Sequence, residues 1–256
     1  MSTAITLNGN SLQTSQITTR SAKHRSGPDV QAAIYALANA NRSIMVSAIH
    51  PSKRIILKGQ LKAASASALD SLCDTFKGYF TTGEMNLDID YAGATRRYVV
   101  VAEKEPIIDG DDVSIADWTA NLLSLQYGMD TTNTTIVSAS GRTSGTYNDA
   151  HTFLGNAPEQ YPVITITLTA VTGGSAASIF VGNNGTGQQL TITRTWSASD
   201  VLVIDTFNRT VKVNNVEVDF SGALPLFAPG AGTLGYVDTF TTRTFTISAV
   251  YAKRWK

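Results

Sequence analysis

The sequence predicts a mainly β protein with one prominent helix, in which an α+β amino-terminal domain precedes a carboxy-terminal β-sandwich. Short segments of alternating apolar and polar residues recur along the 256 residues, as in strands with one buried face. A single stretch, residues 67–80, has the spacing of a helix instead. After about residue 130 charges become sparse and Thr, Ser, Gly and Asn dominate. We therefore expect domains at 1–130 and 157–256, joined by a linker or edge strand at 131–156.

The first clear alternation of apolar and polar residues in the first half predicts a strand at Lys53–Leu61. Ile55, Leu57 and Leu61 share one parity, so they should face the core. Gly59 interrupts the strand and indicates a bulge or a close approach of another chain segment. The earlier segment from Asp29 to Asn39 fits either a short helix, because of its alanines, or a strand, because of its neighbours.

A helix follows this strand. Ser67, with Asp70 three residues later, resembles a capping box at its start. The apolar residues that share one helical face are Leu69, Leu72, Cys73, Phe76 and Phe80. Cys73 is the only cysteine, so its place in this stripe favours a small core residue over a nucleophile. It also excludes an internal disulfide and a zinc site built from the cysteines of one chain.

The next segments predict a hairpin and a further strand. Met85–Tyr91 alternates apolar residues with Asn86, Asp88 and Asp90, and Gly93 turns the chain into the apolar run after Arg97. Asp117–Leu125 then reads as another strand.

The second half predicts many short strands separated by glycine-rich turns, which favours a jelly-roll or galectin-like sandwich. Its alternating apolar residues include Ile164, Ile166, Leu168, Leu190, Ile192, Phe245, Ile247, Ala249 and Tyr251. The clearest hairpin turns at Asn214-Asn215. Its register pairs Val213 with Val216 and Val211 with Val218 on a core face, and sets Lys212 opposite Glu217 on a solvent face.

Charge and composition exclude several classes of protein. Twenty basic and twenty acidic residues cancel, so no global field attracts nucleic acid or an anionic membrane. The first residues lack the pattern of a secretory signal, and no segment approaches the roughly 20 apolar residues of a membrane span. We expect a soluble protein made in a reducing cytoplasm, without membrane insertion.

The sequence carries no motif of a metal or cofactor site, and we expect none. His24, His50 and His151 are scattered, and Asp109, Asp111 and Asp112 lack the spacing of a calcium loop. The glycine-rich run at 182–188 lacks the Lys-Ser/Thr of a phosphate-binding loop and predicts a hairpin instead. No nucleophile elbow is present, and the carboxylates of the second half form no pair typical of a glycoside hydrolase. The protein is therefore predicted not to be an enzyme.

Trp196 is the aromatic residue of the second half that would serve to stack on a sugar ring. A tryptophan in a β-sandwich more often packs in the core, so its exposure decides between the two interpretations.

Several of these segments together resemble the siphophage distal tail proteins, the Dit family, which form the hub of the phage tail tip. The resemblance lies in the helix SALDSLCDTFKGYF, the hairpin MNLDIDYAG with RRYVVV, and the run LVIDTFNRTVKVNNVEV, LFAPGAGTLGY and AVYAKRWK. It covers most of the chain in the order of the family, although the residues before Lys53 match weakly. It implies an amino-terminal domain that forms a ring, commonly hexameric, under the tail tube, and a galectin-like domain that radiates outward.

The resemblance implies a structural virion protein of a long-tailed phage, assembled in the host cytoplasm. Its partners would be further copies of itself, the tail tube protein and the tail-tip or receptor-binding proteins. The alternation of Met85–Tyr91 adds that in such a ring Asn86, Asp88 and Asp90 could line the channel, where an acidic wall lets DNA pass without binding; the other interpretation is an ordinary solvated strand face. The alternative is a carbohydrate-binding module or adhesin that works through the sandwich and Trp196.

Overall fold

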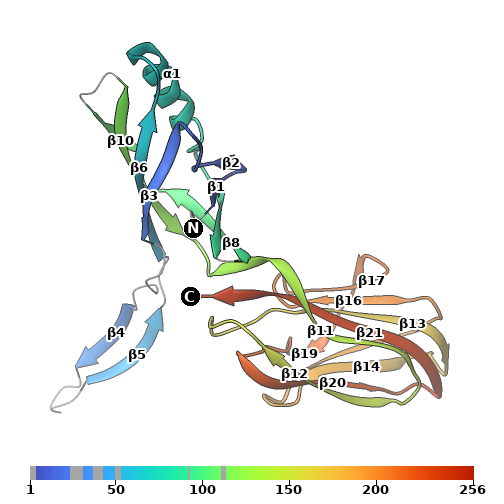
Figure 1. Ribbon diagram of the computed structural model, residues 1–256. Helices are drawn as coiled ribbons and strands as arrows, with labels where there is room; N and C mark the ends of the chain where they lie inside the picture. The colour runs from blue at the N-terminus through green and yellow to red at the C-terminus, as the bar shows by residue number, and fades with distance from the viewer. Residues whose placement is uncertain (1–3, 24–30, 37–42, 50–52, 92, 111–113) are drawn as a thin grey trace. The chain divides into compact units, whose positions relative to one another are not determined.

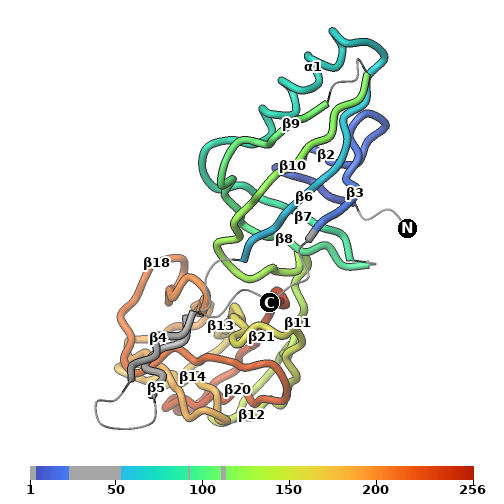
Figure 2. The backbone as a smooth tube through the Cα atoms, turned by 90° about the vertical axis from the view of Figure 1, so that its left-hand side faces the viewer, coloured from blue at the N-terminus to red at the C-terminus, as the bar shows by residue number. Residues whose placement is uncertain are grey.

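The computed structural model describes residues 4–23, 31–36, 43–49, 53–91, 93–110 and 114–256. The chain divides into two compact units, Met1–Thr131 together with Lys256, and Thr132–Trp255. Figures 1 and 2 show the elements of both units from two directions. Each unit has its own hydrophobic core.

Unit 1 is an antiparallel sheet covered by one helix. Its elements are β1 (Ile5–Leu7), β2 (Asn10–Ser11), β3 (Ile17–Lys23), β4 (Gln31–Ala36), β5 (Ser43–Ile49), β6 (Lys53–Lys62), α1 (Ala66–Lys77), β7 (Met85–Tyr91), β8 (Ala94–Ala102), β9 (Ile107–Asp109) and β10 (Ile115–Ser124). In the main sheet the order is β1-β7-β8-β10-β6-β3, with β2 beside β1 and β9 beside β10. β4 and β5 pair with each other in a separate two-stranded sheet.

The predicted alternation of the first half is confirmed by the core of unit 1. Ile55, Leu57 and Leu61 of β6 are fully buried, as are Leu87 and Ile89 of β7. The hairpin of β7 and β8 and the strand at Asp117–Leu125, observed as β10, are confirmed. β4 shows that the strand alternative was right for residues 31–36, while 29, 30 and 37–39 lie outside the described residues.

α1 packs its predicted stripe on β6 and β10, and Figure 2 shows it along the side of the sheet. The Phe76 ring lies 4.9 Å from that of Trp118 on β10. Cys73 lies half-buried against this core, and burial raises the pKa of its thiol, which fits the predicted packing role.

The predicted capping box at Ser67 is wrong. The N-cap is Ser65, whose backbone is extended and whose hydroxyl accepts a hydrogen bond from the Ala68 amide at 3.3 Å. Ser67 already lies in the first turn, where its carbonyl accepts from the Ser71 hydroxyl. The pattern shows that a helix begins here, but only the backbone geometry identifies which serine caps it.

Gly59 marks the close approach that the sequence predicted. A Cβ at this position would lie 1.8 Å from the Thr18 carbonyl oxygen and 2.7 Å from the Trp118 ring. The bulge lies in the neighbouring strand β3, between Thr19 and Ser21. Glycine is therefore required here so that β3 and the indole can both pack on β6.

Unit 2 is a β-sandwich of two antiparallel sheets, visible as two layers in Figure 1. Its elements are β11 (Gly128–Arg142), β12 (Thr146–Phe153), β13 (Val163–Thr172), β14 (Ala177–Asn183), β15 (Gln188–Arg194), β16 (Val201–Asp205), β17 (Thr210–Val213), β18 (Val216–Glu217), β19 (Ser221–Gly222), β20 (Gly230–Asp238) and β21 (Thr242–Trp255). One sheet has the order β18-β17-β16-β13-β21-β11, and the other β12-β20-β14-β15-β19. The nine alternating apolar residues predicted for the second half all lie in the core between them, so this part of the fold class is confirmed.

Residues 131–156, expected to be a linker or an edge strand, form most of β11 and all of β12. β12 is the edge strand of its sheet. β11 begins in unit 1, where Met129 and Asp130 pair with β8, and it continues into unit 2.

The hairpin of β17 and β18 has the predicted register, with Val213 opposite Val216 and Lys212 opposite Glu217. Asn214 and Asn215 have φ values of 52° and 64°, as a type I′ turn requires. The expected burial of Val216 is wrong, since this side chain is 66% exposed. β18 is only two residues long and ends its sheet, so no opposing layer covers Val216. No helix in the described parts of the chain is long and apolar enough to cross a membrane.

Candidate functional site

The outer face of β7 holds the three residues predicted to line a channel. Met85, Leu87 and Ile89 enter the core, so Asn86, Asp88 and Asp90 point to the other side. The carboxylate of Asp88 accepts two hydrogen bonds from the Arg97 guanidinium, each of 2.8 Å. This pairing raises the pKa of Arg97 and cancels the charge of Asp88. The face is therefore less acidic than the strand alone predicts.

Arg97 is the residue of this face that sequence reasoning missed, although a signal for it exists. Tyr91, the last residue of β7, pairs with Ala94, the first residue of β8. Counting outward from that pair places Asp88 opposite Arg97, as observed. Opposite charges in directly paired positions are a common cross-strand contact.

Trp196 lies in the core of unit 2, so of the two interpretations weighed for it the structure favours core packing over stacking on a sugar. Only 3% of the residue is exposed, and its indole N–H donates to the Ala177 carbonyl at 3.0 Å. The Phe240 ring meets it edge-on at 6.4 Å between ring centres. The indole therefore presents no face to a ligand, and the carbohydrate alternative loses the residue on which it rested.

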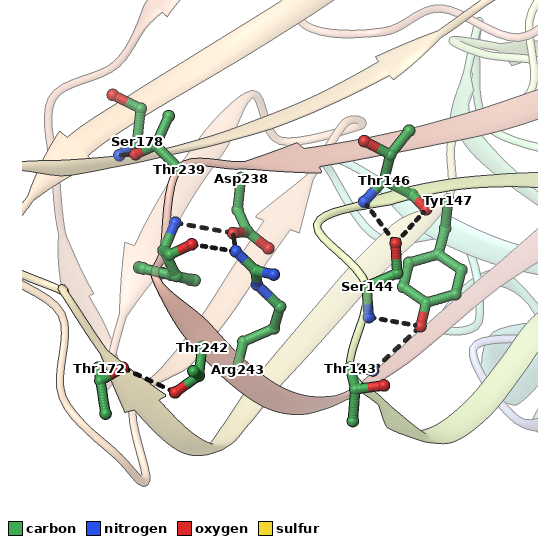
Figure 3. Close-up of polar contacts among 11 residues, drawn as sticks. Thr143, Ser144, Thr146, Tyr147, Thr172, Ser178, Asp238, Thr239, Thr242 and Arg243 are labelled. Atoms are coloured by element: carbon green, nitrogen blue, oxygen red, sulfur yellow. Dashed lines mark hydrogen bonds and ion pairs between the residues drawn. The ribbon is translucent and has the colours of Figure 1, made fainter.

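A buried ion pair organises one end of the sandwich (Figure 3). Arg243, at the start of β21, reaches Asp238, at the end of β20, with 2.8 Å between Nη2 and Oδ1. The same carboxylate oxygen accepts from the Phe240 amide at 2.9 Å. The Asp238 side chain is fully buried and that of Arg243 is 12% exposed. Burial and the nearby Asp238 charge together raise the pKa of Tyr236, so this phenol stays neutral.

Hydrogen bonds join the remaining loops of this end, as Figure 3 shows. The Tyr147 hydroxyl accepts from the amides of Thr143 and Ser144, each at 3.0 Å. The Thr172 and Thr242 hydroxyls lie 2.7 Å apart, which connects β13 to β21. These hydrogen bonds and the ion pair tie the loops of this end to one another, which indicates a structural role for its polar residues.

Three of the acidic residues of the second half, Asp149, Asp200 and Asp205, are engaged locally. Asp149 binds Arg142 through both oxygens, and Asp200 binds the Asn214 amide and the Ser197 N–H. Asp205 accepts from the turn that follows it. Each carboxylate therefore stabilises a turn or a strand pair.

Metal ligands do not gather within the described ranges, where no group of three His, Cys, Asp or Glu residues is positioned to hold an ion. His24, His50, Asp111 and Asp112 lie outside the described residues. The run at 182–188 is the predicted hairpin, between β14 and β15.

His151 is a packed core histidine. Its ring meets Phe153 and Phe227 edge-on, and Nδ1 lies 3.1 Å from the Asp149 carbonyl. Burial lowers the pKa of the imidazole, so the folded protein holds it neutral. The folded state then takes up the proton less readily than the unfolded chain, whose histidine titrates near pH 6.5.

His151 is therefore expected to make unit 2 less stable as the pH falls below about 6.5, with the loss complete below the lowered pKa of the folded state. Replacing His151 with glutamine should flatten this part of the stability profile. The measurement is urea denaturation of the two proteins between pH 7.5 and 5. The other two histidines are common to both, so parallel profiles would contradict the assignment.

Sequence reasoning also missed an open groove of about 440 Å³ beside β15 and β18, lined by residues 192–195 and 217–219. Its charged lining residues are Arg194, Glu217 and Asp219. This mixed charge selects no single class of ligand.

Two comparisons relate this geometry to known proteins. Residues 155–255, most of unit 2, match the family model described as the C-terminal domain of siphovirus-type tail components. No curated protein sequence matches the chain.

Among solved structures, the chain is similar to the Dit protein of phage SPP1, described as a paradigm of the hub adsorption apparatus in phages that infect Gram-positive bacteria. The TM-score is 0.69 at 11% identity, and the likeness covers 99% of each chain. A chain of the phage P2 baseplate in its calcium-activated conformation has a TM-score of 0.50 at 8% identity, over 98% of each chain. At such identities the likeness shows the fold. The resemblance predicted from the sequence motifs is thus confirmed, through the family model for the C-terminal domain and through the fold for the whole length.

Proposed function

We propose that the protein is a ring-shaped distal tail hub. Two findings support this: unit 2 matches the family model for the C-terminal domain of siphovirus-type tail components, and the chain has the Dit fold over its whole length. The coarse assignment, a non-enzymatic structural component of a phage tail, follows from the family model. The finer proposal is that unit 1 forms the ring under the tail tube and that unit 2 carries the tip or receptor-binding proteins. The single observation that supports it most is the 99% coverage of the SPP1 hub protein.

The separate hairpin of β4 and β5 supports self-association. A two-stranded hairpin is marginally stable by itself in water. A neighbouring copy would supply the missing contacts if the hairpin served as an arm between subunits. This fits a ring, in which each copy meets the next through two different surfaces.

The channel proposal for the β7 face now rests on Asn86 and Asp90, because Asp88 is paired with Arg97. A face without free cations would still let DNA slide past, since Lys and Arg contacts with phosphate supply most non-specific affinity. The face need only avoid a net positive charge to serve this purpose.

Native mass spectrometry with negative-stain imaging of the purified protein tests the proposal. A closed ring of six would weigh about 164 kDa, six times the 27.3 kDa chain. A chain that stays monomeric at high concentration, alone and with tail tube protein, would contradict the hub.

A further inference from the structure

We propose that unit 1 binds a second copy of this chain through opposite charges, with the outer face of β3 and β6 on one copy meeting the exposed side of α1 on the next. The inference rests on the proposed ring and names the two surfaces that close it.

The outer face of β3 and β6 carries a basic strip, defined as Arg20, Lys58 and Lys62. All three are exposed. Leu57 and Leu61 enter the core, and successive side chains of a strand point to opposite faces, so Lys58 and Lys62 point outward. Arg20 binds the side-chain oxygen of Gln60, which fixes it beside the two lysines. No ion pair within the described part of the chain includes a residue of the strip.

The strip lacks an internal counter-charge of matching size. On the neighbouring strands of this face Asp117 lies opposite Gln60, and Asp109 lies opposite Asp117, so two carboxylates stand against three cations. Glu103, a further carboxylate, is held by Arg54 at 2.7 Å. The strip therefore keeps a net positive charge on an exposed sheet surface.

The exposed side of α1 carries Asp70 and Asp74, one turn apart. Carboxylates at this spacing repel each other, and neither lies in the first turn, where the helix dipole would favour it. Lys77 is the basic residue of the helix, three residues beyond Asp74. Two carboxylates outnumber the single Lys77, so the exposed side of α1 keeps a net negative charge.

The two surfaces lie on opposite sides of one unit. α1 packs on the inner face of the sheet through Leu69 and Phe76, whereas Lys58 and Lys62 leave the outer face. A head-to-tail interface requires two different surfaces of this kind, because each copy must offer one to either neighbour. Two equal surfaces meeting across a twofold axis would bring like charges together.

A second copy is a better occupant than nucleic acid. The chain has equal numbers of acidic and basic residues, so the matching charge is present in every copy. A basic strip left open near the path of the genome would hold DNA through its phosphates. Pairing the strip with a neighbour removes that contact.

Two charge-reversed variants of the full chain test the inference. The first is Lys58→Glu with Lys62→Glu, and the second is Asp70→Lys with Asp74→Lys. Each variant alone should need at least tenfold more protein to form rings at low salt, because like charges then meet at the interface. An equal mixture of the two should assemble again, since each acidic surface then finds a basic partner. The fourfold variant should assemble alone for the same reason.

The control is Lys104→Glu with Arg209→Glu. It changes the net charge by the same amount and in the same direction as Lys58→Glu with Lys62→Glu, at exposed positions outside both surfaces. It should leave ring formation unchanged. Thermal melting of each variant separates loss of assembly from loss of folding. In Asp70→Lys, Asp74→Lys the higher helix propensity of lysine opposes the new repulsion with Lys77, so α1 should stay folded.

Native mass spectrometry of all five proteins decides the outcome. Rings that survive both reversals, or a mixture that fails to assemble, would refute the pairing while leaving the hub intact. A first variant that keeps its rings and loses only the retention of DNA fragments would assign the strip to nucleic acid instead. An original chain that never assembles would refute the hub and this inference together.

Discussion

Replacing Arg243 with methionine is expected to lower the free energy of unfolding of unit 2 by about 3–5 kcal/mol. The change removes the charge partner of Asp238, whose carboxylate is fully buried 2.8 Å from the guanidinium. The Phe240 amide still binds that carboxylate, but a neutral N–H does not replace a full charge. Urea denaturation measures the loss of unfolding free energy. Hydrogen exchange of the β20 and β21 amides shows that the loss lies within unit 2.

The matched control for this prediction combines Arg243→Met with Asp238→Asn. Removing both charges avoids an unpaired buried carboxylate, so the double variant should recover a large part of the lost stability. A single variant as stable as the original protein would show that the pair is not desolvated. It would also show that the ion pair is not what holds this end of the sandwich together.

Replacing Trp196 with alanine is expected to cost about 3–5 kcal/mol, the range for deleting a large aromatic side chain from a core. The change opens a cavity beside Phe240 and leaves the Ala177 carbonyl without its 3.0 Å donor. The same denaturation experiment measures it. Trp196→Phe, which keeps most of the apolar volume, should lose less.

This prediction also separates the hub from the carbohydrate alternative. A sugar-stacking tryptophan stands on the surface, and its removal would change stability by only about 0.5 kcal/mol or less. Full stability of the alanine variant, together with loss of binding on a glycan array, would restore the alternative.

Much of the fold follows from local patterns. The alternation of β6, β7, β13 and β21 and the stripe of α1 are readable because one face of each element is buried. The Asn214-Asn215 turn is readable because the chemistry of two residues sets the register of its hairpin.

The strands that sequence reasoning missed lack such patterns. β3 reads ITTRSAK, with one large apolar residue, and β1 is three residues long. Both strands form because neighbouring strands hydrogen-bond to them. Ile17 of β3 pairs with Leu61 of β6, and Ile5 of β1 pairs with Ile89 of β7. Strand propensity depends on such neighbours more than on the segment itself.

The candidate site shows the same division. Alternation alone predicts that Asn86, Asp88 and Asp90 share a face, and it holds in the structure. Their charge balance depends on Arg97 in the next strand, and the complementary surfaces of unit 1 depend on a helix and a strand that cover opposite faces.

By itself the sequence determined the strands with clear alternation, the helix and the main hairpins, because period and turn chemistry act between residues a few positions apart. It also determined the likeness to tail hub proteins, because those segments occur in the same order. Only the tertiary structure decided that Trp196 is buried, that Asp238 and Arg243 form a desolvated pair, and that Val216 is exposed. Burial depends on which distant segments cover a side chain, and no local pattern records that.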